Sequence, residues 1–186
     1  MRIVGGEHRG RVLTAPRGRN TRPTSDRARE AMFNQIGHAP WAPSLDDARV
    51  IDLYAGSGAL GLEAMSRGAA FCLFVENEPA ARGAIRENID MLSLFGHTRL
   101  HRRDATALGK LPPNVGGQFD IALLDPPYGK GLGERTLHQL LKGGWLSEDA
   151  IVMLEVGTEE TPELPAWEQL DEKVYGAARV LFLRVA

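Results

Sequence analysis

The sequence predicts an α/β fold, in which a mostly parallel sheet of seven strands has helices on both faces and follows a β-hairpin and a helix. Short apolar runs alternate with amphipathic segments, which is typical of a parallel sheet covered on both sides. The first run, beginning at Val50, leads into a turn that holds three glycines. A chain of 186 residues provides one sizeable core and is too short for two full domains. We therefore expect one compact domain, made of an extension over 1–38 and a core over 39–186.

The extension contains a hairpin and a helix in this reading. Two short runs with apolar residues, 2–4 and 11–13, flank Gly5, Gly6 and Gly10, which favours a hairpin. The order Pro23-Thr-Ser25 predicts the start of a helix with a hydroxyl cap, and apolar spacing continues it to about Ile36. Residues 37–44, with two prolines, are expected to be a linker.

The core is expected to alternate strands and helices. Beyond the strand that begins at Val50, further strands are predicted over 70–75, 98–101, 119–124, 150–156, 167–175 and 179–185, with helices after the glycine turn, over 79–94 and over 134–141. The last two strands surround Gly176 and should form an antiparallel pair. The ligand site of such a sheet lies beyond the carboxyl ends of the strands, near the point where strand order reverses.

The glycine turn is a candidate cofactor cradle. Gly56-Ser-Gly-Ala-Leu-Gly61 follows a strand and opens a helix, so it matches the dinucleotide fingerprint G-x-G-x-x-G. Residues without a Cβ let the backbone lie against a ligand, and the helix N-terminus favours an anionic group. Glu76 stands twenty residues after Gly56, where a ribose-binding acid is expected. On this evidence a nicotinamide oxidoreductase remains an alternative.

Two further features favour S-adenosyl-L-methionine over a dinucleotide. Asp52 precedes Gly56 by four residues, and Asp52-Leu-Tyr-Ala-Gly-Ser-Gly58 resembles the D-x-x-x-G-x-G motif of class I methyltransferases. About seventy residues later, an apolar strand runs into Asp125-Pro-Pro-Tyr128, which resembles the D-P-P-Y motif of methyltransferases that modify exocyclic amino groups. The expected fold thereby becomes the Rossmann-like fold of class I methyltransferases.

These motifs define the candidate cofactor residues. Glu76 is expected to accept from both ribose hydroxyls, and its alternative role is a solvated acid in a turn. Asp104 is expected to accept from the adenine amino group beside the Ala105 N–H; its alternative is a helix cap, and the two roles are compatible. The cofactor set is Asp52, Tyr54, Ala55, Gly56, Ser57, Gly58, Glu76, Asn77, Asp104 and Ala105.

The segment Asp125-Pro-Pro-Tyr128 is the candidate catalytic site. An exocyclic amine on a base is a poor nucleophile, so the site must orient it and localise its lone pair. We assign the Asp125 carboxylate and the Pro126 carbonyl as acceptors for the amine, with Pro126 and Pro127 making the turn rigid. Tyr128 is expected to stack on a base that has left its helix, and this stacking should need the ring and not the hydroxyl.

Charge is unevenly distributed along the chain. The net charge is −2, but residues 1–30 hold eight arginines against three acids, a local charge of +5. Arginine pairs well with phosphate, so this segment indicates a polyanion partner; the alternative is a solvated tail. Deleting residues 1–20 is expected to weaken RNA binding and to spare cofactor affinity. The candidate RNA contacts are Arg2, Arg9, Arg11, Arg17, Arg19, Arg22 and Lys130.

Several other classes of function lack support in the sequence. Cys72, the one cysteine, lies in an apolar run and is interpreted as a buried structural thiol. The five histidines lack metal-ligand spacing, so no metal is expected. The sequence contains neither a run long enough to cross a bilayer nor a signal peptide, so we expect a cytoplasmic protein, acting as a monomer.

Longer matches narrow the resemblance to one family. The opening Met1-Arg-Ile-Val-Gly-Gly6 and the run Arg22-Pro-Thr-Ser-Asp-Arg27, together with both core motifs, resemble the RsmD family. Those are bacterial methyltransferases that act on guanine N2 in small-subunit (16S) ribosomal RNA. The resemblance implies this activity, and it places Arg22, Pro23 and Thr24 beside the cofactor and substrate pocket. Two alternatives are a methyltransferase for adenine N6 or cytosine N4 in DNA or RNA, and a non-catalytic RNA-binding assembly factor.

Overall fold

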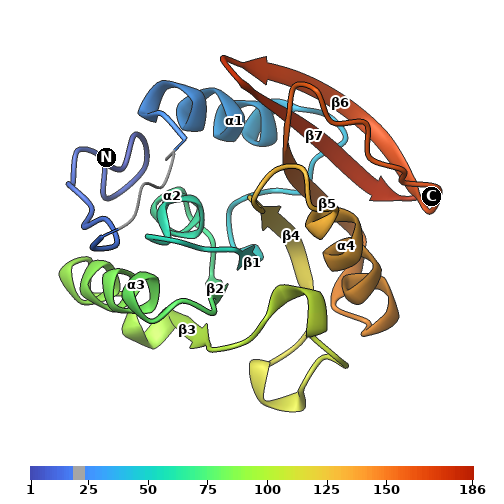
Figure 1. Ribbon diagram of the computed structural model, residues 1–186. Helices are drawn as coiled ribbons and strands as arrows, with labels where there is room; N and C mark the ends of the chain where they lie inside the picture. Colours follow the sequence, from blue (N-terminus) through green and yellow to red (C-terminus); the bar gives the residue numbers. More distant parts are fainter. Residues whose placement is uncertain (19–23) are drawn as a thin grey trace.

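A computed structural model describes residues 1–18 and 24–186 and shows one seven-stranded sheet within them. The strands are β1 (Arg49–Leu53), β2 (Phe71–Val75), β3 (Thr98–His101), β4 (Phe119–Leu124), β5 (Leu146–Gly157), β6 (Trp167–Tyr175) and β7 (Ala178–Val185). The helices are α1 (Asp26–His38), α2 (Ala59–Ser66), α3 (Pro79–Met91) and α4 (Leu132–Lys142), with single 3₁₀ turns η1 (Phe95–His97), η2 (Ala105–Ala107) and η3 (Pro113–Val115). The predicted α/β class is confirmed (Figure 1).

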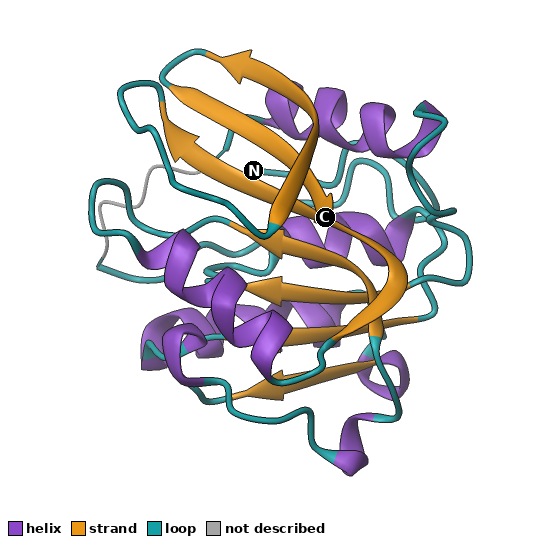
Figure 2. Cartoon of the chain, turned by 90° about the vertical axis from the view of Figure 1, so that its right-hand side faces the viewer, coloured by secondary structure: helices purple, strands orange, loops and turns teal. Residues whose placement is uncertain are grey.

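Strand order brings the two sequence motifs together. The order is β3-β2-β1-β4-β5-β7-β6, so β1 lies between β2 and β4, and the chain crosses from one half of the sheet to the other. The first five strands of this order are parallel, while β7 runs antiparallel to both β5 and β6. The carboxyl ends of β1 and β4 therefore lie side by side. Figure 2 shows neighbouring strands of the sheet ending at the same edge. This is the switch point at which such sheets bind ligands.

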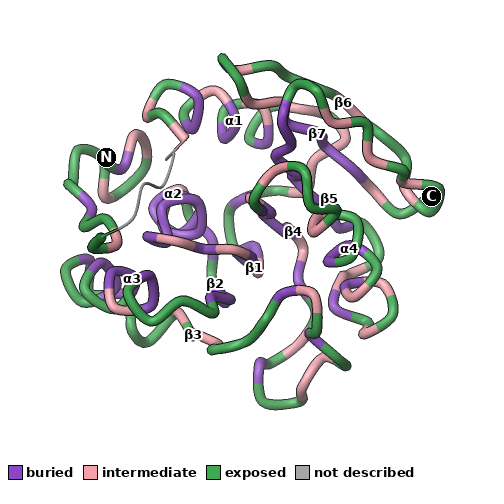
Figure 3. The backbone as a smooth tube through the Cα atoms, viewed as in Figure 1, coloured by how far each residue is buried: buried purple, intermediate pink, exposed green. Residues whose placement is uncertain are grey.

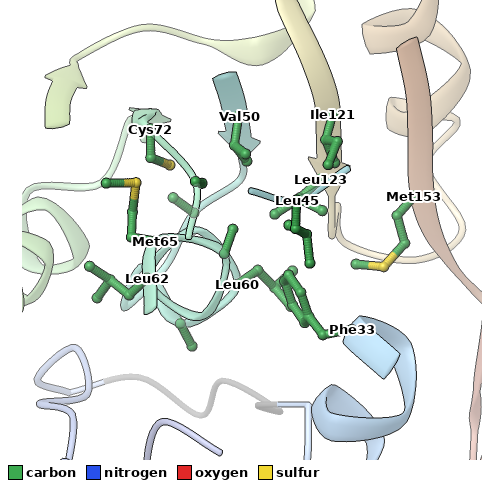
Figure 4. Close-up of a cluster of buried hydrophobic side chains, with 14 of the residues drawn as sticks. Phe33, Leu45, Val50, Leu60, Leu62, Met65, Cys72, Ile121, Leu123 and Met153 are labelled. Carbon is green, nitrogen blue, oxygen red and sulfur yellow. The ribbon is translucent and has the colours of Figure 1, made fainter. Parts of the chain in front are cut away.

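Each face of the sheet packs its own core. Helices α1, α2 and α3 cover one face, and α4 with the 3₁₀ turns η2 and η3 covers the other (Figure 1). Figure 4 shows Leu60 and Met65 of α2 among Phe33 of α1 and the strand residues Val50 and Cys72. All eight residues of α2 are buried, as the tube of Figure 3 also shows, because the extension covers the outer side of this helix. Burial on all sides explains why most residues of α2 are apolar, with Glu63 and Ser66 as its polar members.

The N-terminal extension packs against the core of the sheet domain. Its hairpin contains an antiparallel bridge between Arg2 and Val12, and main-chain hydrogen bonds such as Ile3 N–H to the Arg11 carbonyl at 2.9 Å join its two arms. Ile3 is buried in the same core as α2. The Glu63 carboxylate, itself fully buried, accepts hydrogen bonds from the main-chain N–H groups of Val4 and Gly5, each at 3.0 Å. A buried anion on the core thus fixes the hairpin.

Local chemistry explains the element boundaries. The Ser25 hydroxyl accepts from the Ala28 N–H, which confirms the predicted cap of α1. Helix α3 ends at Met91, before the predicted 94, because Ser93 adopts a positive φ of 57°. Cys72 is buried, as expected. No helix in the described part of the chain is long and apolar enough to cross a membrane.

Candidate active site

One cavity of about 790 Å³ opens at the carboxyl edge of the parallel strands. It is lined by the turns after β1, β2 and β4, by the segment after β3, and by parts of the extension. The lining residues that the sequence predicts are Thr24, Tyr54, Ala55, Gly56, Ser57, Glu76, Asn77, Asp104, Ala105, Asp125, Pro126, Pro127 and Tyr128. Both sequence motifs therefore face one space, 790 Å³ being within the size range of small-molecule sites.

Glu76 organises the cofactor turn. Its Oε1 accepts from the Gly56 N–H at 2.8 Å, and its Oε2 accepts from the Glu78 N–H at 2.9 Å. Gly56 has a φ of +60°, and a Cβ added there would meet no atom within 4 Å, so the backbone at this turn is open on its cavity side. An acidic side chain and an exposed backbone at one turn fit the ribose end of a nucleoside cofactor.

Asp52 differs from its sequence-based prediction. Only 1% of the residue is exposed, it does not line the cavity, and its Oδ2 accepts from the Gly61 N–H at 2.9 Å. Burial, with a smaller contribution from Glu76, raises the pKa of the carboxyl well above its usual range, against the Gly61 hydrogen bond. The side chain therefore holds α2 against β1 outside the cavity. The predicted contact of Asp52 with a ligand is corrected to a positioning role.

Gly58 and Gly61 also act in packing and do not line the cavity. A Cβ on Gly61 would lie 2.5 Å from Phe74 Cε1, and one on Gly58 would lie 3.2 Å from the same atom. The second and third glycines of the motif thus let α2 approach β2 closely. The prediction that Gly58 contacts the cofactor is corrected on the same ground.

Asp104 caps the turn η2. Its Oδ1 accepts from the Thr106 N–H at 2.8 Å and from the Thr106 hydroxyl at 2.7 Å. These two hydrogen bonds lower the pKa of the carboxyl. Asp104 and Ala105 line the cavity as well, so the capping role is observed and the adenine contact stays a prediction.

The acceptor motif at the end of β4 is connected to β5 and to the extension. The Tyr128 hydroxyl donates to Glu155 Oε1 at 2.7 Å, and the Thr24 hydroxyl donates to Glu155 Oε2 at 3.2 Å. The Tyr128 ring also lies over Gly157, where an added Cβ would be 3.1 Å from Tyr128 Cδ2. The hydroxyl of Tyr128 therefore has a structural partner, which the expectation of a pure stacking ring did not include.

The predicted RNA contacts that the structure describes do not line the cavity. Arg2, Arg9, Arg11, Arg17 and Lys130 are exposed and do not line it. Arg11 Nη2 donates to the Met91 carbonyl at 3.1 Å. The other two predicted RNA contacts, Arg19 and Arg22, lie outside the described residues, as does Pro23, which was predicted beside the pocket.

Several residues of the site carried no usable signal in the sequence. Glu155 sits within a strand and Asn88 within a helix, and neither belongs to a motif. Asn88 is fully buried and donates to the carbonyls of Thr14 and Ser57, at 3.0 and 2.9 Å. Met1 lines the cavity and its Sδ lies 3.8 Å from Ser57 Oγ. Because the hairpin contributes Met1 to the cavity lining, deleting residues 1–20 should weaken cofactor binding. This differs from the expectation from the sequence that such a deletion spares cofactor affinity.

Three arginines outside the predicted set line the cavity, namely Arg29, Arg103 and Arg135. Arg29 is fully buried and its Nη2 donates to Asp26 Oδ1 at 2.7 Å within α1. The same Nη2 also donates to the Arg2 carbonyl, which connects α1 with the hairpin. Within residues 1–18 and 24–186, no group of three or more His, Cys, Asp or Glu side chains could hold a metal ion.

Comparison with known proteins agrees with this geometry. The family described as Conserved hypothetical protein 95 matches residues 1–184. The chain belongs to this family, the RsmD family. Ribosomal RNA small subunit methyltransferase D of Escherichia coli is 38% identical over 178 residues, covering 95% of this chain and 85% of that protein. The protein of the same name from Haemophilus influenzae is 31% identical over 180 residues, covering 95% and 89%.

Solved structures show the same fold. The Escherichia coli protein yhhF matches with a TM-score of 0.82 and 35% identity, covering 100% of this chain and 97% of that one. A Thermus thermophilus hypothetical protein matches with a TM-score of 0.75 and 28% identity, covering 100% and 99%. The predicted family and the class I methyltransferase fold are therefore confirmed, and this RsmD-family chain is a methyltransferase.

Proposed function

We propose that this RsmD-family chain transfers a methyl group from S-adenosyl-L-methionine to the exocyclic N2 amino group of a guanine in small-subunit (16S) ribosomal RNA. The observation that carries the proposal is the single cavity shared by the Gly56 turn and Asp125-Pro-Pro-Tyr128. Relatives named for methylation of small-subunit ribosomal RNA support the RNA substrate.

The cofactor half would be held by the turns after β1, β2 and β3. Glu76 would accept from the ribose hydroxyls with the oxygen capacity that its two main-chain bonds leave, and Asp104 would accept from the adenine amino group. The open backbone at Gly56 allows close approach. The cofactor, when bound, supplies an electrophilic methyl group on a sulfonium.

The acceptor half would orient the amine. The nitrogen lone pair of an exocyclic amine is delocalised into the ring, so the nitrogen must be held in line with the methyl group. Asp125 and the Pro126 carbonyl would accept the N–H groups, and Pro127 restricts the turn. Because positive charge develops on the amine during transfer, a carboxylate beside it favours the transition state more than the ground state.

The basic extension would bind RNA backbone around the cavity. Arg9, Arg11 and Arg17 are exposed on or next to the hairpin, which lies beside α2 and α3 (Figure 1). A target base must leave its stack to reach Asp125, and phosphate contacts at the rim would stabilise that arrangement. We place the protein in the cytoplasm, with its RNA substrate, and propose that it acts as a monomer, which light scattering of the purified protein checks.

The test is methyl transfer from tritiated S-adenosyl-L-methionine to small-subunit ribosomal RNA, deproteinised and as assembled particles, followed by nucleoside mass spectrometry. N2-methylguanosine is the expected product. N6-methyladenosine or N4-methylcytidine would establish the other amino-methyltransferase, and RNA binding without any transfer would establish an assembly factor. Cofactor calorimetry with S-adenosylhomocysteine and with NAD separates these outcomes from an oxidoreductase.

A further inference from the structure

A second carboxylate lies beside the catalytic aspartate. Strands β4 and β5 pair in parallel with Leu124 opposite Leu154, so the next residues along the two chains are Asp125 and Glu155. The Asp125 N–H still reaches the Leu53 carbonyl at 3.5 Å, which keeps the chain extended past the end of β4. Neighbouring strands lie about 4.8 Å apart and residues in parallel register point to the same face. Figure 1 shows β4 and β5 as neighbours in the sheet.

Glu155 is built into the cavity wall. It is 6% exposed and lines the same space as Asp125. Its two oxygens each receive one hydroxyl hydrogen bond, from Tyr128 and from Thr24. A carboxylate oxygen accepts more than one hydrogen bond, so these donors fix the orientation of the group and leave it able to accept from a ligand.

The pair of carboxylates offers acceptors only, and this matches one base. Guanine presents the ring N1–H next to its N2 amine. On that side of the base, the ring nitrogen and the amine are therefore both hydrogen-bond donors. Adenine and cytosine place a ring nitrogen with a lone pair beside their amino group. An acceptor pair therefore fits guanine and repels the other two, whereas Asp125-Pro-Pro-Tyr128 alone recognises an amine without choosing its base.

We propose that Glu155 accepts a hydrogen bond from guanine N1–H while Asp125 accepts from the N2 amine, so that Glu155 selects the base. This inference rests on the proposed function. Tyr128 and Thr24 are positioning residues for Glu155, and through Thr24 the extension is connected to base selection. The buried position strengthens discrimination, because a base without the N1–H leaves the carboxylate facing a lone pair.

The test uses 2-aminopurine, which keeps the 2-amino group and lacks the N1–H. Small-subunit ribosomal RNA fragments carry either guanine or 2-aminopurine at the target position mapped by mass spectrometry, and kcat/KM is measured for each. The parent protein should prefer guanine by about 10- to 100-fold. Glu155→Ala should lower kcat/KM on guanine and bring this preference to about threefold or less, with S-adenosylhomocysteine affinity unchanged.

Glu155→Gln gives a sharper test, because the amide of the new side chain can donate to the N1 lone pair of 2-aminopurine. This variant should raise kcat/KM on 2-aminopurine relative to kcat/KM on guanine. Tyr128→Phe and Thr24→Val keep the carboxylate, so they should slow both substrates by similar factors and preserve the preference. The matched control is Glu148→Gln, at an exposed position of the same strand, which should change neither rate.

Two results would overturn the inference while the proposed function stands. One is a parent protein that methylates guanine and 2-aminopurine equally well. The other is an unchanged preference in Glu155→Ala, which would leave Glu155 with a structural role alone. A parent protein that methylates no guanine in either RNA would instead overturn the proposed function, and the inference with it.

Discussion

The two halves of the cavity are stabilised in different ways. On the cofactor side, Glu76 and Asn88 bind main-chain atoms of the Gly56 turn and its neighbours, so the backbone itself is fixed. On the acceptor side, Tyr128 is held through side chains, by its hydrogen bond to Glu155. The contrast follows from what each half recognises. Under the proposed function, the fixed backbone of the Gly56 turn leaves room for the nucleoside beside the Glu76 and Asp104 carboxylates, whereas choice among bases depends on the direction of individual donors and acceptors.

This difference predicts that substitutions in the two halves affect different measurable quantities. Acceptor-side changes should lower kcat or alter base preference. Cofactor-side changes should alter cofactor affinity or stability.

The largest effect is expected at Asp125. Asp125→Ala removes a carboxylate that favours the transition state, so kcat should fall by about 10²–10³-fold. Affinity for S-adenosylhomocysteine, measured by calorimetry, should stay within about twofold. Asp149→Ala, at an exposed position of β5, is the control. Full activity in Asp125→Ala would place the amine acceptor elsewhere in the cavity.

Glu76 should show the reverse pattern. Glu76→Ala removes the ribose acceptor and also frees the N–H groups of Gly56 and Glu78, so cofactor binding should weaken by about 1–3 kcal/mol. At saturating cofactor, kcat should recover most of its value. The control is Glu87→Ala on the exposed side of α3. Parental cofactor affinity in a folded Glu76→Ala protein would remove Glu76 from the binding site.

Asn88 tests whether the hairpin and the cofactor turn are coupled. Asn88→Ala leaves the Thr14 and Ser57 carbonyls without their buried donor, which should lower the free energy of unfolding by about 1–3 kcal/mol. Cofactor affinity should fall by a few-fold in the same protein. Urea unfolding and calorimetry measure the two effects, with the exposed Asn114→Ala as reference. A loss of stability with unchanged affinity would separate the hairpin from the turn.

Asp52 gives the smallest effect, visible through pH. Burial raises its folded pKa, so the stability that it contributes is present below the unfolded pKa of about 3.9 and is lost as pH rises through the folded pKa. Asp52→Asn does not titrate and should gain stability relative to the parent across that range. Urea unfolding from pH 4 to pH 8 checks the direction, with Asp149→Asn as the exposed control. A difference that is independent of pH would contradict it.

The sequence by itself determined the fold class, the family and the position of both motifs. Alternating apolar runs, the spacing from Asp52 to Gly61 and the Pro-Pro turn are local patterns, and local patterns are readable along the chain. The same locality explains why Glu76, Asp104 and the Asp125 segment were predicted at the cavity that the structure shows.

The tertiary structure decided which side of a strand each acid faces and which distant residues meet. Asp52 points toward Gly61 of helix α2, although its motif suggested a ligand contact. Glu155 became visible only when β4 and β5 were placed in register, and Thr24 reaches it across 131 positions of sequence. Contacts of this kind depend on strand order and packing, which a single sequence specifies only through the whole fold.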